Sequence, residues 1–288
     1  MAGVAVRALA VATLVVAASG CAGSGREART APAPPVSALT APAPALLRRL
    51  IALETGMPVK GSRTSGVDQI CLTRVGGKQK TCSAAETAKA ARQFRAWQAA
   101  LRPALGETPE TIAALRLAGG RRIVLVAWWT RTGALCLETG DASTSGGTSG
   151  AFGPCLGAAA RASGQKQSPS YACDAICLHS SHTRSGYLLA GTVAPSATAL
   201  AVTDSRGATT TYPLTGPRVP HGSSRVFMAS LSAHDWRRLS LRRGSTVLAS
   251  RIMPRAQAAI EDCEEQYGDH GAKLEGCMSA ATGSTFPP

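Results

Sequence analysis

The sequence predicts an α+β protein: an N-terminal α+β domain with disulfide-stapled hairpins, then a β-sandwich, then a short C-terminal helical hairpin. Helix and strand patterns mix over residues 45–160, short strand patterns recur over 171–253, and nine cysteines are spread along the 288 residues. A content of 44% apolar and 17% charged residues is typical of a globular protein and excludes wholesale disorder. No apolar run approaches the roughly 20 residues of a membrane-spanning helix, which excludes a multispanning protein.

The N-terminus has the features of an export signal. Arg7 supplies a short positive start, and residues 8–18 are apolar except for Thr13. As a helix this run would span about 16 Å, which is too short for a hydrocarbon core of roughly 30 Å and suits a signal peptide. We therefore expect residues 1–20 to be a signal peptide.

The segment Ala18-Ser19-Gly20-Cys21 resembles the lipobox of bacterial lipoproteins. This resemblance implies that Cys21 receives a palmitate-bearing diacylglycerol and becomes the first residue after cleavage. It predicts a bacterial protein anchored by lipid on the outer face of the cytoplasmic membrane, in the cell envelope. The motif usually has Leu where Ala18 stands. The alternative is a secreted protein cut by an ordinary signal peptidase near Gly20 or Ala22.

Residues 21–44 are rich in Pro, Ala, Ser and Gly. Such a segment cannot bury a core and favours extended, polyproline-like conformations. We expect it to be a tether between the lipid on Cys21 and the folded body.

Three segments of the first domain show apolar residues at helical spacing, namely 46–56, 83–101 and 108–117. Ser83 and Glu86 form a capping box, which predicts the start of the second helix. In the third, Thr108-Pro109 is an N-cap followed by a favoured first-turn proline. The sequence therefore predicts three helices here.

The strands of the first domain are predicted from apolar runs and turns. Residues 68–72 form a strand-like run, and 122–129 is strongly apolar and rich in β-formers. The turn Arg131-Thr132-Gly133 returns the latter through 134–138 as a hairpin. Residues 139–170 are rich in Gly, Ser, Thr and Ala without periodicity, and we expect a long loop.

The second domain, residues 171–253, contains six strand-like segments spaced by about 8–12 residues, which is typical of a sandwich. These segments are 187–193, 199–203, 209–214, 226–231, 236–241 and 246–252. This part resembles the Ig-like or prealbumin-like modules of secreted bacterial proteins. Residues 254–283 are predicted to form the helical hairpin.

The cysteine count fits an exported protein. Without Cys21, eight cysteines remain, an even number that permits full pairing in an oxidising compartment. Neighbour pairing across turns predicts four disulfides: Cys71–Cys82, Cys136–Cys155, Cys263–Cys277 and, by elimination, Cys173–Cys177. The absence of a Cys-x-x-Cys motif and of zinc-finger spacing predicts no metal site.

No motif for catalysis or for a cofactor is found. Ser163 and Lys166 match Ser-x-x-Lys, but they fall in a polar segment without the motifs that accompany it in penicillin-recognising enzymes. The five histidines are His179, His182, His221, His234 and His270. His234-Asp235 lacks the spacing that would fix a triad. The acidic residues at 261–265 have the pattern of a solvated helix face.

The chain is strongly basic, with 31 Lys and Arg against 17 Asp and Glu and a net charge of +14. Because an exported protein does not meet the nucleic acids of the cytoplasm, we expect no nucleic-acid partner. Outside the membrane, the available polyanions are lipid headgroups and anionic wall polymers, which would attract the basic surface in a salt-dependent way. A solvated basic surface without a partner has the same composition.

The sequence favours a non-enzymatic, surface-anchored lipoprotein that binds a protein or small-molecule ligand. The segment 140–153 and the pair Trp128-Trp129 are the predicted contact surface, although one Trp of such a pair is usually in the core. The alternative is an extracytoplasmic hydrolase. Histidines that converge with carboxylates or with Cys173 in a pocket would favour an enzyme or a metal site, whereas we expect the histidines to be scattered.

Overall fold

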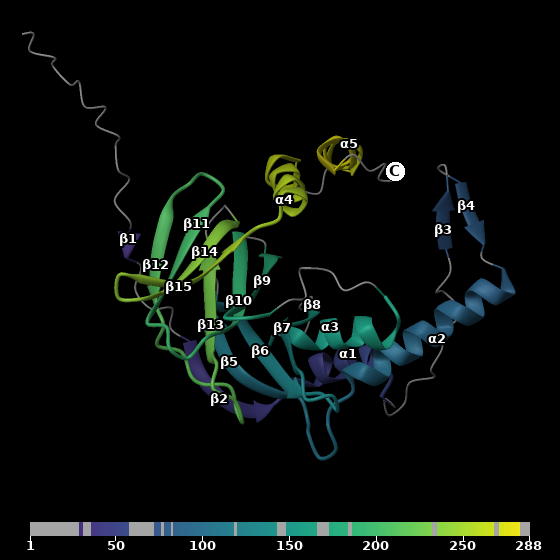
Figure 1. Ribbon diagram of the computed structural model, residues 1–288, viewed down its shortest axis with the longest axis horizontal. Helices are drawn as coiled ribbons and strands as arrows, with labels where there is room; N and C mark the ends of the chain where they lie inside the picture. Colours follow the sequence, from purple (N-terminus) through teal and green to yellow (C-terminus); the bar gives the residue numbers. More distant parts are fainter. Residues whose placement is uncertain are drawn as a thin grey trace, which may run out of the picture.

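The computed structural model describes residues 29–30, 36–57, 72–75, 78–81, 83–117, 120–142, 148–165, 173–183, 186–231, 235–267 and 271–282. Within these residues the chain forms fifteen strands and five helices (Figure 1). The secondary structure is therefore α+β and rich in strands. Three sheets and a group of helices form successive layers, and a separate hairpin consists of β3 (Leu72–Val75) and β4 (Lys78–Thr81).

The first sheet has the order β2-β5-β6-β7-β8 and is antiparallel. Its strands are β2 (Val36–Pro42), β5 (Glu110–Arg116), β6 (Arg122–Trp129), β7 (Leu135–Asp141) and β8 (Thr148–Phe152). Three helices pack on one face: α1 (Ala45–Glu54), α2 (Ala84–Leu101) and α3 (Pro154–Ala162). Figure 1 shows these helices gathered beside this sheet.

Both faces of this sheet are buried because side chains alternate along each strand. On β6, Val124, Val126 and Trp128 pack among the helices, while Ile123 and Leu125 point to the opposite face. The Nε1 of Trp128 donates a hydrogen bond of 2.9 Å to the backbone oxygen of Leu101. The polar end of this buried side chain is thereby satisfied at the end of α2.

Local signals set the helix starts. Ser83 and Glu86 form the expected capping box, in which the Ser83 Oγ accepts from the Glu86 N–H and the Glu86 side chain accepts from the Ser83 N–H. Helix α3 begins at Pro154, directly after Gly153 with a φ of 101°. A Cβ at Gly153 would lie 3.1 Å from the Leu135 oxygen in a backbone conformation that L-residues avoid, so the turn requires glycine.

The second sheet has the order β13-β10-β9 and lies between the other two. Its strands are β9 (Ile176–Thr183), β10 (Gly186–Val193) and β13 (Arg225–Leu231). Leu188 and Met228 pack against the first sheet, whereas Leu189 and Phe227 point the other way. Strands β10 and β13 therefore read as nearly continuous apolar runs, whereas β9 is apolar only at its start and continues as His-Ser-Ser-His-Thr.

The third sheet has the order β1-β12-β11-β14-β15. Its strands are β1 (Arg29–Thr30), β11 (Ala199–Asp204), β12 (Thr209–Pro213), β14 (Trp236–Arg243) and β15 (Thr246–Ile252). It faces the middle sheet across one apolar cluster that includes Leu200, Trp236 and Leu241. The chain ends in α4 (Arg255–Tyr267) and α5 (Gly271–Thr282), which lie beyond the strands at the top of Figure 1.

Several predicted elements are confirmed. The helices at 46–56 and 83–101, the hairpin at 122–138, the six strands of the second domain and the C-terminal helical hairpin all form. The predicted strand at 68–72 lies almost wholly outside the described residues.

The predicted tether is wrong at its C-terminal end. Residues 36–42 form β2, an edge strand paired with β5, and Ala43 is buried in the helix-facing cluster. Proline is tolerated on an edge strand because its missing N–H removes no hydrogen bond within the sheet. The Pro-rich composition therefore concealed a strand.

Two further predictions are corrected. Residues 110–116 form strand β5 and not a helix, because the first sheet is covered on both faces and residues 111–115 are all buried. The expected loop at 139–170 instead contains the end of β7, strand β8 and helix α3. Alanine and glycine let α3 pack closely on the sheet, with Ala159 fully buried.

The predicted domains at 45–160 and 171–253 share an apolar core. Ile112 and Leu125 of the first sheet belong to the same apolar cluster as Leu188 and Met228 of the middle sheet. The structure thus joins the two units through a common layer of side chains.

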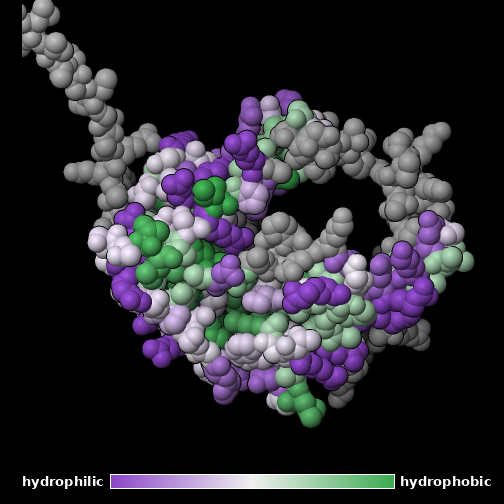
Figure 2. Space-filling view, viewed as in Figure 1, coloured by the Kyte–Doolittle hydropathy of each residue, from purple (hydrophilic) through white to green (hydrophobic). Residues whose placement is uncertain are grey.

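The molecular surface is uneven in character. Figure 2 shows hydrophobic surface over the strands at the left of the view, while α2 at the right is mostly hydrophilic. Val247, Leu248 and Ile252 of the edge strand β15 are among the exposed large apolar residues. None of the helices in the described residues is both long and apolar enough to cross a membrane.

Candidate functional site

A cavity of about 280 Å³ lies where the edges of the three sheets meet. Strands β8, β9 and β15 each end the strand order of their sheet, and each supplies residues to the wall. Helices α3 and α4 add Leu156 and Gln257. The complete lining among the described residues is Phe152, Gly153, Leu156, Cys173, Cys177, Leu178, His179, Ser180, Trp236, Arg251 and Gln257.

Arg251 is the one Lys or Arg side chain in this lining. Its Nη1 donates a 3.0 Å hydrogen bond to the Leu178 oxygen on β9, and its Cζ lies 5.5 Å from the centre of the Trp236 ring. Burial lowers the pKa of Arg251 from its ordinary value, but a guanidinium stays charged at neutral pH. The lining contains no Asp or Glu, so the cavity holds a positive charge without an acidic partner in its described wall.

His179 is the second titratable group of the cavity. Its ring stacks on Phe152 of β8 with 5.0 Å between ring centres. Burial lowers the pKa of His179, and the positive charge of Arg251 lowers it further. The imidazole is therefore neutral at pH 7 and can accept a proton or a hydrogen bond.

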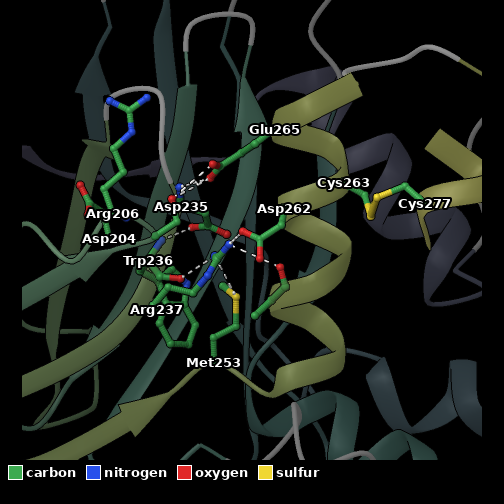
Figure 3. A network of polar contacts seen from close by, with 12 residues as sticks. Asp204, Arg206, Asp235, Trp236, Arg237, Met253, Asp262, Cys263, Glu265 and Cys277 are labelled. Atoms are coloured by element: carbon green, nitrogen blue, oxygen red, sulfur yellow. Dashed lines mark hydrogen bonds and ion pairs between the residues drawn. A yellow bond between two sulfur atoms is a disulfide. The ribbon is translucent and has the colours of Figure 1, made fainter. Parts of the chain in front are cut away.

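Behind the cavity, Asp235 is fully buried in a polar network (Figure 3). Its Oδ1 accepts from the Trp236 N–H at 2.7 Å, and its Oδ2 accepts from the Ser180 Oγ at 3.0 Å. Burial raises the pKa of Asp235 to about 6, although these two hydrogen bonds act in the opposite direction. The Asp235 N–H donates in turn to Glu265 of α4 at 3.1 Å.

The network in Figure 3 attaches α4 to the third sheet. Glu265 accepts from the Ser205 Oγ at 3.2 Å, and Arg237 forms an ion pair with Asp262. The disulfide Cys263–Cys277 then links α4 to α5. Asp262 is exposed, as expected for a solvated helix face, although it pairs with Arg237. The expectation is wrong for Glu265, which is half-buried and accepts from Ser205 and from the Asp235 N–H.

A second buried carboxyl, Glu138 on β7, lies on the helix-facing side of the first sheet. Its residue is 2% exposed, and its Oε2 has no hydrogen-bond partner. Burial raises the pKa of Glu138 to about 8, with a smaller contribution from the negative charge of Glu54. The group is neutral at pH 7 and lies outside the cavity lining.

Of the predicted disulfides, Cys136–Cys155, Cys173–Cys177 and Cys263–Cys277 are present in the structure. Cys71, Cys82 and the proposed lipid attachment residue Cys21 lie outside the described residues. Disulfides are typical of proteins that fold in an oxidising compartment, which fits export from the cytoplasm.

The histidines are not all scattered. His179 shares the cavity with Cys173, contrary to expectation, although that sulfur is bonded to Cys177. His221 lines a small pocket of about 60 Å³ beside Trp129. His234, His270 and the side chain of His182 lie outside the described residues. No group of three or more potential metal ligands occurs among the residues that the structure describes.

The predicted contact surface is only partly accessible. Trp128 is in the core, as expected for one Trp of the pair, while Trp129 is half-buried and donates from Nε1 to the Pro220 oxygen at 3.3 Å. Residues 143–147 of the segment 140–153 lie outside the described part. Ser163 is buried at the end of α3 and donates to the Ala160 oxygen, which is a structural role.

Sequence reasoning missed Arg251, Trp236 and Gln257, which come from three separate elements. The spacing of Cys173, Cys177 and His179 was the available signal, because residues two apart on a strand share a face. Comparison of the chain with protein-family models, curated proteins and solved structures finds no match.

Proposed function

We propose that this chain is an exported, lipid-anchored binding protein whose cavity holds a small organic anion. The observation that carries the proposal is the guanidinium of Arg251 beside aromatic rings, in a described wall of mixed polar and apolar residues that contains no Asp or Glu. An anionic ligand group would compensate this charge, while Phe152, Leu156 and Trp236 would contact an apolar body.

The hydrolase alternative has less support. A general base must lie within hydrogen-bond reach of the nucleophile, yet Ser180 and the neutral imidazole of His179 are neighbours on one strand and point to opposite faces. Ser180 instead donates to the buried carboxyl of Asp235. This arrangement favours the binding proposal over the hydrolase.

In this proposal the third and middle sheets form a β-sandwich that carries the binding site, and Cys21 carries the lipid. Strand β1 begins at Arg29, eight residues after Cys21. An extended chain spans at most about 3.6 Å per residue, so the body would lie within roughly 30 Å of the membrane surface. Its basic surface would then be held near anionic headgroups or wall polymers by salt-dependent attraction.

The ligand test uses naphthalene-2-carboxylate and its neutral analogue naphthalene-2-carboxamide in isothermal titration calorimetry. We expect the carboxylate to bind at least tenfold more tightly than the carboxamide. Arg251→Gln should remove this difference. Arg238→Gln is the matched control, because Arg238 is an exposed residue of the neighbouring strand outside the cavity lining and its loss changes the net charge equally. Equal affinities for the two compounds, or no binding of either, would refute an anion site.

The anchor is tested separately by labelling cells with an alkyne-bearing palmitate analogue. We expect label on the wild-type protein and none on Cys21→Ser, which should move from the membrane fraction to the medium. Equal labelling and fractionation of both proteins would rule out the lipid at Cys21.

A further inference from the structure

We propose that Cys173–Cys177 is a thiol-exchangeable disulfide that reacts with small thiol compounds entering the cavity. Both cysteines line the cavity, together with His179 and Arg251. This inference does not depend on the identity of the proposed anionic ligand, because it concerns the reactivity of the wall itself.

Access distinguishes this disulfide from Cys136–Cys155. Both residues of the latter are fully buried between the first sheet and α3. Cys173, in contrast, is half-buried and borders the cavity, while Cys177 is 5% exposed. An attacking sulfur can therefore approach Cys173, with Cys177 as the leaving group.

Charge distinguishes it from Cys263–Cys277. Cys263 lies on α4 among the acidic residues Asp262, Glu264 and Glu265, and this negative charge opposes the formation of a thiolate. At Cys173 the adjacent acid is Asp174 alone, which is exposed to solvent, and the cavity wall supplies the cation of Arg251. Positive, partly exposed surroundings favour thiolates.

The position of His179 adds a proton acceptor. Cys177 and His179 are two residues apart on β9, so their side chains share one face of the strand. The neutral imidazole of His179 can take the proton of an incoming thiol and so generate the attacking thiolate inside the cavity.

The exchange consists of two balanced steps. The thiolate of the first compound attacks the Cys173 sulfur, a mixed disulfide forms, the Cys173–Cys177 bond breaks, and Cys177 leaves as a thiolate. A second thiolate then attacks the sulfur of the bound compound, which departs as a symmetric disulfide and leaves Cys173 as a thiolate. Two thiols are oxidised, the protein disulfide gains two electrons, and the protons return to the two cysteines.

Chain connectivity makes the opening local. Only three residues separate Cys173 and Cys177, compared with sequence separations of 19 and 14 for the other two described disulfides. Because a short loop loses little chain entropy on closure, reduction of this bond should leave the fold intact.

The test exposes the native full-length protein to reduced glutathione at pH 7 and quenches samples with N-ethylmaleimide. Peptide mass spectrometry then follows each disulfide. We expect Cys173–Cys177 to open at least tenfold faster than Cys136–Cys155 and Cys263–Cys277, without loss of the circular dichroism signal. Simultaneous opening of all three, or earlier opening of Cys263–Cys277, would overturn the proposal.

Two variants test the role of the cavity. Arg251→Gln and His179→Gln should each slow the opening of Cys173–Cys177 by several-fold, while Arg238→Gln should not change it. The rate at Cys136–Cys155 serves as an internal measure of folding in each sample. If a variant loosens the fold, the rate of opening at Cys136–Cys155 rises. The proposal is then judged by the order in which the three disulfides open in the wild-type protein. Loss of anion binding with retained exchange would reject the proposed function alone.

Discussion

Replacing Glu138 by Gln should make the protein less sensitive to pH. Glu138 is buried on β7, its Oε2 lacks a hydrogen-bond partner, and burial raises its pKa to about 8. In the unfolded chain the same carboxyl has its ordinary pKa of 4.5. An amide has nearly the same shape but does not ionise, so Glu138→Gln removes this titration.

The magnitude follows from the difference between the two pKa values. Below pH 4.5 the carboxyl is protonated in both states, and its contribution to stability is fully present. As pH rises, the unfolded state releases the proton first and is stabilised relative to the folded state. Between pH 4.5 and 7 the folded state loses about 3 kcal/mol, at roughly 1.4 kcal/mol per pH unit, and the loss levels off above pH 8.

Urea denaturation at pH 4.5, 6, 7 and 8 measures this effect. The free energy of unfolding of Glu138→Gln minus that of wild type should increase by about 3 kcal/mol from pH 4.5 to 7. Asp235 titrates in both proteins, so its contribution cancels. Only the change with pH matters, because the amide alters the stability by a constant amount at every pH. A difference that stays flat across this range would refute the assignment of a neutral, desolvated carboxyl.

Two other substitutions test packing and docking. Gly191→Ala should prevent stable folding, since the added Cβ would lie 2.1 Å from the Cys177 oxygen at a φ of 143°; a loss of the cooperative thermal transition would show it. Glu265→Ala should destabilise the protein by about 1–3 kcal/mol, because the buried N–H of Asp235 loses its acceptor. It should also speed hydrogen exchange in α4.

Matched controls separate these effects from the mere loss of a glycine or a charge. Gly207→Ala introduces a Cβ with no atom within 4 Å and should cost far less than Gly191→Ala. Glu264→Ala removes an acid from the same helix and should leave the exchange of α4 unchanged. If the control and the test variant behave alike in either pair, the proposed contact is not the cause.

Local signals predicted the parts of the fold that depend on neighbouring residues. The capping box of Ser83 and Glu86 placed the start of α2, and the short turns placed the strands from β10 to β15. Neighbour pairing correctly predicted the three described disulfides, because each joins two cysteines that are consecutive along the chain. The capping box and the turns are decided within a few residues of the chain.

Long-range contacts decided what the sequence could not predict. Residues 111–115 are buried on both faces, so the alternation of apolar and polar residues that marks a strand is absent from β5. The spacing of Ile112 and Leu115 instead suggested a helix. The edge strand β2 is specified by its pairing with β5 and not by its Pro-rich composition. The cavity is still harder to predict from the sequence, because His179, Trp236 and Arg251 meet only when three sheets are stacked.

The meeting of three sheet edges at the cavity has a consequence for self-association. An open strand edge presents unpaired backbone groups onto which another copy of the chain can add a strand. Here the guanidinium of Arg251 donates a hydrogen bond to the Leu178 oxygen of β9, and Gln257 of α4 lines the same cavity. The Arg251 side chain therefore blocks one backbone acceptor of β9 against intermolecular pairing, whereas β15, with Val247, Leu248 and Ile252 exposed, is the edge onto which another copy can add a strand.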